Sequence, residues 1–326
     1  MAISTDVLHK VAQAVGAETV ASTQLIQSLW GGYGELFRAT LIGSQYPSVI
    51  VKHIKLPQPK HHPRGWNTAT SHQRKLTSYQ VEVNWYQHFA NQCVEQCPVP
   101  KCLFVDAKDG EILLILEDLN LLGFSEVQKE VEHAQVKACL TWLAYFHAQH
   151  LAAEPKGLWA CGTYWHLDTR PDELAALTDL ALKDAADKID QALKSCRFQT
   201  LVHGDAKLAN FCFTPAGDHV AAVDFQYVGK GCGMKDVVLL LSSCVPFDEC
   251  ENRVPDLLDH YFAKLKHALS ELQPQVDPEQ VEQEWRPLYC VAWADFQRFV
   301  KGWCPGHWKI NPYTEGLTQQ ALAQLR

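Results

Sequence analysis

Two carboxylates and an amide follow short apolar runs near residue 200. The segment 201–211 reads LVHGDAKLANF, in which Asn210 comes five residues after Asp205, and a second apolar run ends at Asp224. One carboxylate can orient or deprotonate an attacking hydroxyl, while the other carboxylate and the amide oxygen can hold Mg²⁺ beside phosphate groups. The set indicates phosphoryl transfer from ATP.

Each of these groups meets a separate chemical requirement. We assign Asp205 as the base, Asn210 as a metal ligand and Asp224 as the principal metal ligand, while Lys207 can reach the transferred phosphate as a point charge. Turn capping is the alternative, because Asp and Asn often bind their own backbone in turns. It does not explain an aspartate that ends a second apolar run nineteen residues after Asp205.

The string HGDAKLAN followed by VDF resembles the aminoglycoside phosphotransferase and choline kinase-like superfamily, whose members are relatives of the protein kinases. Gln226, and the later Gly233 and Asp236, are most similar to the ecdysteroid kinase-like branch. The resemblance implies a bilobal kinase-like α+β fold, ATP and Mg²⁺ as cofactors, a small-molecule hydroxyl as acceptor, and an Asp236 that supports the catalytic loop. HGD in place of HRD, and no evident APE segment, disfavour a protein kinase.

Glycines between the first two predicted strands are suited to close contact with phosphates, because they let backbone N–H groups approach. They are Gly31, Gly32 and Gly34. An ordinary hairpin turn is the alternative for this cluster. The resemblance implies that these residues lie over the nucleotide phosphates.

Lys52 interrupts the apolar strand Val49 to Val51 and matches the lysine of the superfamily that contacts the α- and β-phosphates. A solvent-facing strand lysine is the alternative, and Lys55 is a nearby competitor. Glu82, on the following predicted helix, is implied to pair with Lys52. The backbone groups of Glu117 and Leu119 are implied to contact adenine in the segment that joins the lobes.

The elements around these residues change character near residue 119. A short helix is predicted at 7–15, strands at 24–30, 36–42, 48–54, near 104 and at 111–116, a long loop at 57–70 and a helix from Ser78. Helical patterns then cover 129–150, 172–194, 251–272 and 278–300, with short strands at 199–203, 210–213 and 219–224. We therefore predict a nucleotide-binding lobe at 1–118 and a catalytic, substrate-binding lobe at 119–326.

Aromatic and charged residues gather near the C-terminal end. Trp293, Asp295 and Trp303 are candidate substrate contacts, because aromatic faces and a carboxylate suit a flat or cationic ligand. Core packing is the alternative for the tryptophans, and pairing with Arg298 is the alternative for Asp295.

Composition limits the partners. The formal charge of −8, from 37 acidic and 29 basic residues, argues against general attraction to nucleic acid or an anionic membrane. No apolar run has the length of a membrane span, so we expect a cytoplasmic protein. An ATP-binding pseudokinase that regulates a partner is the rival function, but a module that only bound ATP would not require the base.

Overall fold

The computed structural model describes residues 3–29, 32–55, 69–108 and 110–326, and contacts divide the chain into two compact units. Unit 1 consists of Met1–Gln92 and Val99–Gly123, and unit 2 of Cys93–Pro98 and Phe124–Arg326. The predicted 57–70 loop lies outside the described residues except for its last two positions, which begin a helix.

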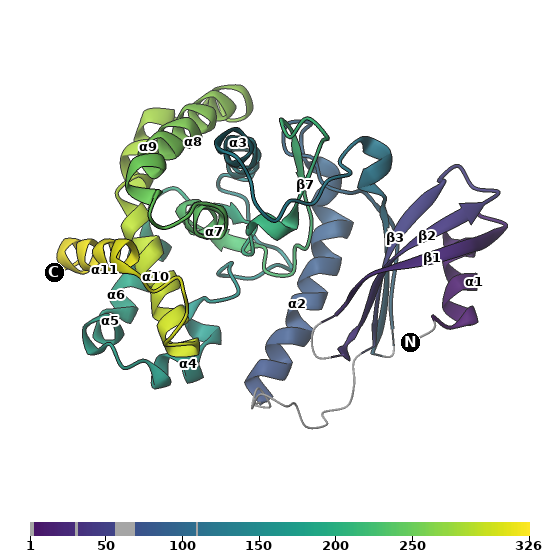
Figure 1. Cartoon of the computed structure of the whole chain (residues 1–326), viewed down its shortest axis with the longest axis horizontal. Coiled ribbons are helices and arrows are strands. Elements are labelled where there is room, and N and C mark those ends of the chain that lie inside the picture. Colours follow the sequence, from purple (N-terminus) through teal and green to yellow (C-terminus); the bar gives the residue numbers. More distant parts are fainter. Residues whose placement is uncertain (1–2, 30–31, 56–68, 109) are drawn as a thin grey trace. The chain divides into compact units, whose positions relative to one another are not determined.

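Unit 1 is built on one antiparallel sheet in the order β1-β2-β3-β5-β4 (Figure 1). Its strands are β1 (Thr19–Ser28), β2 (Gly34–Ile42), β3 (Ser48–Lys55), β4 (Cys102–Lys108) and β5 (Glu111–Glu117). Its helices are α1 (Thr5–Ala14) and α2 (Ala69–His88), with short 3₁₀ turns at Ala90–Gln92 and Leu119–Leu122.

Alternating side chains of the sheet form two cores. On one face, Phe37 and Val51 pack with Val11 of α1. On the other, Ile54 and its neighbours pack with Tyr79 of α2. Successive strand residues point to opposite faces, so the apolar run of β3 contributes to both cores. A strand that is apolar on both faces fits the central position that β3 has in the sheet.

Unit 2 is mainly helical. Its long helices are α3 (His133–Gln149), α7 (Met234–Cys244), α8 (Cys250–Leu272), α10 (Leu288–Trp303) and α11 (Pro312–Gln324). Shorter ones are α4 (Pro171–Ala176), α5 (Leu180–Asp184), α6 (Ala186–Ser195) and α9 (Pro278–Trp285), with 3₁₀ turns at Leu167–Thr169 and Leu208–Asn210. Two small antiparallel sheets pair β6 (Thr200–Val202) with β9 (Gly229–Gly231) and β7 (Phe211–Phe213) with β8 (Val220–Ala222). Helix α10 contacts α4, α6, α7 and α11, and α3 contacts α8 (Figure 1).

The predicted α+β fold, with a sheet-rich first part and a helix-rich second part, is confirmed. Several predicted boundaries are wrong. The helix expected from Ser78 begins at Ala69, the first strand begins at Thr19, and α11 was not predicted. The helix expected at 172–194 is three helices, and the one at 278–300 breaks at Pro287, which has no N–H to continue an α-helix. Among the helices described, none combines the length and apolar character that crossing a bilayer requires.

Candidate active site

Gly34, at the start of β2, has no room for a side chain beside β3. Gly34 opens β2 with φ +149°, and a Cβ added there would lie 2.0 Å from the carbonyl oxygen of His53 on β3. Gly32 has φ +75° and open space around its Cα. Gly31 lies outside the described residues. Only glycine fits position 34, whatever the hairpin binds.

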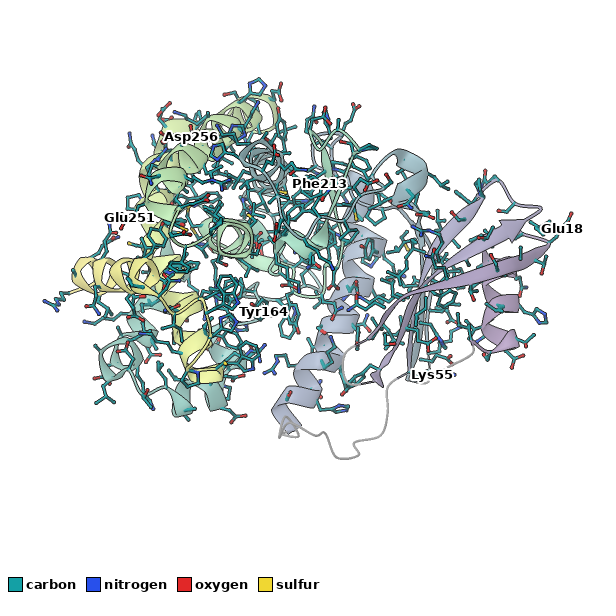
Figure 2. All side chains as sticks on the ribbon, viewed as in Figure 1. Glu18, Lys55, Tyr164, Phe213, Glu251 and Asp256 are labelled. Atoms are coloured by element: carbon teal, nitrogen blue, oxygen red, sulfur yellow. The ribbon has the colours of Figure 1, made fainter. Side chains whose placement is uncertain are left out.

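Lys52 and Glu82 form a buried ion pair in unit 1. The Lys52 ammonium donates to both carboxylate oxygens of Glu82, each at 2.8 Å, and the two residues are 5% and 2% exposed. Lys55, the competing candidate and the last residue of β3, is labelled in Figure 2. Its side chain is 63% exposed, and its ammonium lies 3.8 Å from the Glu111 carboxylate. The pairing distinguishes the two lysines, because a buried ammonium needs a counter-charge and an exposed one does not.

The segment after β5 is fixed by Asp118, which the sequence did not single out. Its carboxylate accepts from Arg38 at 2.7 Å and from Ser48 at 2.6 Å. Burial acts to raise the pKa of Asp118, but these two hydrogen bonds, the Asn120 N–H and the Arg38 charge together outweigh it and lower the pKa. Asp118 thus holds the backbone between Glu117, the last residue of β5, and Leu119. Adenine contacts at those two residues stay a prediction.

In unit 2 the loop between β6 and β7 carries Asp205, Lys207 and Asn210. One carboxylate oxygen of Asp205, Oδ2, accepts from the Lys207 ammonium at 2.8 Å and from the Asn210 amide at 3.1 Å. The other oxygen, Oδ1, is buried and has no hydrogen-bond partner among the described residues. One carboxylate oxygen of Asp205 thus has two donors, and the other is buried and unpaired within the described part of the chain.

The protonation of Asp205 is shifted by its surroundings. Asp205 is 5% exposed, and burial raises its pKa. The nearby Asp224 carboxylate raises the pKa further, while the Lys207 ammonium lowers it. A carboxylate with a raised pKa is a stronger base than a solvated one.

Asp224 follows β8 in a strained conformation. Its φ is +69°, which is unfavourable for a residue with a Cβ, and Gln226 donates to its Oδ1 at 2.7 Å. The N–H of the preceding Val223 donates to the carbonyl of Asn210 at 3.0 Å. That bond ties the Asp224 segment to the Asp205 loop, so the residues predicted as metal ligands belong to one connected structure.

Asp236 supports the same loop from α7. Its carboxylate accepts from the backbone N–H groups of His203 at 2.5 Å and Gly204 at 2.9 Å, and lies 3.1 Å from Nε2 of His147. Gly204 has φ +80°, and a Cβ there would meet the carbonyl oxygen of Tyr227 at 2.0 Å. Asp236 is the third residue of α7, and its carboxylate binds the loop that carries Asp205. This is the support of the catalytic loop that the resemblance implied.

The comparisons with known proteins assign this arrangement to a family. The sequence profile of the phosphotransferase enzyme family matches residues 68–274, more than half of the chain. The chain belongs to the phosphotransferase enzyme family. The matched range includes Asp205, Asn210 and Asp224 but ends before the tryptophan-rich region. The sequence-based prediction of a phosphotransferase is thereby confirmed.

Solved structures of similar fold support the same architecture. A choline kinase from Cryptosporidium parvum Iowa II is 12% identical, with 99% of this chain and 94% of that chain covered and a TM-score of 0.52. A microcompartment-associated aminopropanol kinase is 15% identical, with 97% and 95% covered and a TM-score of 0.50. At these identities the likeness shows the fold alone. No curated protein sequence matches the chain. The ecdysteroid kinase-like branch stays a prediction.

Asp295 has internal partners, which is the alternative that the sequence left open. Arg298 donates to its Oδ1 at 2.9 Å, Trp165 donates to its Oδ2 at 3.0 Å, and Lys235 lies 3.6 Å from Oδ2. The residue is 1% exposed, and the Lys235 and Arg298 charges lower its pKa against the opposing effect of burial. Both oxygens are occupied, so we no longer assign Asp295 to the substrate.

The two candidate tryptophans lie in different surroundings. Trp293 is 3% exposed, and its indole N–H has no hydrogen-bond partner among the described residues. Trp303 is 43% exposed, and its ring stacks on Phe299 at 5.9 Å between centroids. Trp293 lines a hollow beside α7, whereas Trp303 does not contribute to that hollow.

Sequence reasoning missed the contacts that join this hollow to the Asp205 loop. Ser243 of α7 accepts from the backbone N–H of Leu208 at 2.9 Å, and the adjacent Ser242 accepts from the Lys309 ammonium at 2.9 Å. Lys309 lies 104 positions after Asp205, inside the region that the sequence marked for its aromatic and charged residues, but it was not itself a candidate. No local pattern marks it, because its surroundings come from distant helices.

Proposed function

We propose that the protein transfers the γ-phosphate of ATP to a hydroxyl group of a small molecule, with Asp205 as the base. Family membership supports phosphotransfer. The observation that carries the assignment of the base is Oδ1 of Asp205, which is buried without a hydrogen-bond partner among the described residues. Leaving a buried acceptor unpaired costs about 1–3 kcal/mol, which a substrate hydroxyl that donated to Oδ1 would offset.

In the proposed step, the acceptor oxygen forms a bond to the γ-phosphorus while the bond between that phosphorus and the bridging oxygen of ADP breaks. ADP leaves with the electron pair of the broken bond. The hydroxyl proton passes to Oδ1 of Asp205 and then to solvent. Lys207 keeps Oδ2 in place and supplies positive charge beside the transferred group.

Asn210 and Asp224 fit a magnesium ion by their chemistry. The Asn210 amide nitrogen is directed to Asp205, which leaves its carbonyl oxygen for another partner, and Asp224 supplies a carboxylate. Mg²⁺ takes oxygen ligands and commonly uses one or two protein groups together with phosphates and waters. When bound, it would neutralise the charge of the phosphates. Lys52, aligned by Glu82, is proposed to bind the nucleotide phosphates in the same reaction.

The hydroxyl acceptor is proposed by analogy with the two proteins of similar fold, which are a choline kinase and an aminopropanol kinase. We further propose the division of labour expected from the sequence, with nucleotide binding by 1–118 and catalysis by 119–326. The rival, a pseudokinase, would bind ATP without consuming it.

One experiment separates the two functions. The wild-type protein and Asp205→Ala are incubated with MgATP and a pool of hydroxylated metabolites, and phosphorylated products are detected by mass spectrometry. We expect products from the wild type, none from the variant, and similar MgATP affinity for both. Products formed equally by the variant would overturn the assignment of Asp205, and ATP binding without any product would favour the pseudokinase.

A further inference from the structure

A hollow in unit 2 lies against α7 and has an aromatic lining with a single cation. It is formed by thirteen residues, among them Trp293, Trp308, Tyr289 and Phe247, and Lys309 is the one charged side chain in that lining. No acidic residue belongs to it. A cationic acceptor would therefore find aromatic faces but also an ammonium of its own sign and no carboxylate.

The Lys309 ammonium is held in place without a counter-charge. Ser242 accepts one of its hydrogens at 2.9 Å, and the nitrogen lies 5.0 Å from the ring centre of Phe296 and 5.4 Å from that of Trp308. An ammonium carries three hydrogens, so two are left for other acceptors. No carboxylate of the described residues lies within ion-pair distance of it, unlike the buried Lys52 and Lys235.

The ammonium is also connected to the reacting loop. Ser242 and Ser243 are consecutive residues of α7, and the first binds Lys309 while the second binds the backbone of Leu208 in the loop of Asp205. The Asp205 charge raises the pKa of Lys309 against the effect of burial. Two consecutive residues of α7 thus join the ammonium to the loop that carries the proposed base.

We propose that the phosphate acceptor is a hydroxy acid with a flat apolar body, whose carboxylate is bound by Lys309 and whose body packs against the aromatic lining of this hollow. The inference rests on the proposed function, since it names the substrate class of the same site. The Trp293 side chain adds an aromatic surface to this lining. A purely structural Lys309, which only tethers its segment to α7, is the alternative.

Three probes that share a phenyl ring and a secondary hydroxyl, and differ in the terminal group that carries the charge, test the proposal. They are 3-phenyllactate, 3-phenylpropane-1,2-diol and 1-amino-3-phenylpropan-2-ol, which are anionic, neutral and cationic at pH 7. Their affinities are measured by calorimetry with the folded wild type, Lys309→Met and Lys309→Arg. The control is Lys188→Met, which removes an exposed lysine of α6.

We expect the wild type to bind the acid at least about tenfold more tightly than the diol, and the amine more weakly than the diol, since a charge-assisted hydrogen bond contributes that much. K309M should reduce affinity for the acid to the level of the diol, K309R should restore part of it, and K188M should change nothing. Equal or tighter binding of the amine, acid affinity unchanged in K309M, or no binding of the acid to the wild type would each overturn the proposal.

The pH dependence provides a second readout that a tether would not show. Burial lowers the pKa of Lys309 to about 8, with Lys207 lowering it and Asp205 and Cys244 opposing the shift. The wild type should lose affinity for 3-phenyllactate as the pH rises above about 8, whereas K309R should keep it, because a guanidinium stays charged. Affinity that is constant from pH 7 to 10 would contradict the inference.

Failure of this inference and failure of the proposed function give different results. Asp205-dependent consumption of ATP with the amine but not with the acid would keep the function and reject the acid. Tight, Lys309-dependent binding of the acid without any consumption of ATP would keep the pocket assignment and reject phosphotransfer to this class.

Discussion

The carboxylate of Asp236 accepts a hydrogen bond from the backbone N–H of His203 at 2.5 Å, across 33 positions of sequence. It holds the N–H of Gly204 in the same way, so one side chain of α7 fixes the two residues that precede Asp205. Because Asp236 is fully buried, neither N–H has water as a substitute partner.

Removing the Asp236 carboxylate should therefore destabilise the fold. Asp236→Ala leaves two buried N–H groups and His147 without their acceptor, and we expect the free energy of unfolding to fall by about 2–4 kcal/mol in urea denaturation. Asp184→Ala, at an exposed aspartate of α5, should change it by less than about 0.5 kcal/mol. Similar values for both variants would show that Asp236 does not support the loop.

A methyl group at Gly204 should be poorly tolerated. It would require a strained φ of +80° and would lie 2.0 Å from the carbonyl oxygen of Tyr227, so Gly204→Ala should lose stability and phosphotransfer together. Gly316→Ala in α11, where a Cβ meets nothing within 4 Å, should be neutral or raise the free energy of unfolding by up to about 1 kcal/mol. Thermal melting compares the two, and equal stability would refute the steric account.

Lys52 and Glu82 should behave as a coupled pair. Either Lys52→Met or Glu82→Gln leaves the other charge buried and should cost about 3–5 kcal/mol of unfolding free energy. The double variant should lose less than the sum of the two single losses, because neither charge then remains. A double-mutant cycle measured by denaturation gives this coupling, and strictly additive losses would contradict it.

The burial of Lys309 should make stability depend on pH in a defined direction. Its pKa is lowered from 10.5 in the unfolded chain to about 8, so between these values the unfolded state holds the extra proton. The free energy of unfolding of the wild type, relative to Lys309→Met, should rise by about 2–3 kcal/mol from pH 7 to 10. The difference cancels titration of the other groups. A flat difference would mean that the ammonium is well solvated in the fold, and a falling one that its pKa is raised instead of lowered.

Short-range relationships were the ones that the sequence predicted well. Asp205 and Asn210 lie five residues apart, so a single loop can bring them into contact, and their hydrogen bond is observed. The possible partner of Asp295 was found at Arg298 because three residues along a helix share a face. The strands β3 and β5 were predicted from their own apolar runs, which are also local features of the sequence.

Long-range relationships could not be predicted in this way. Lys235 and Trp165 reach Asp295 from other elements, and Lys309 reaches Ser242 across 67 positions, so no local pattern marks these contacts. The break at Pro287 could have been predicted, because a proline interrupts a helix. The prediction of one helix at 278–300 followed the helical periodicity instead.

The most direct test of the central claim compares the wild type with Asp205→Asn, which keeps the size of the side chain and removes the base. Turnover of MgATP is measured with a phosphorylated acceptor found in the metabolite pool, together with the Kd of MgATP. We predict that the variant loses at least about a hundredfold in kcat, as expected for a general base, with a Kd for MgATP within a few-fold of the wild type. A variant with the kcat of the wild type would contradict the account.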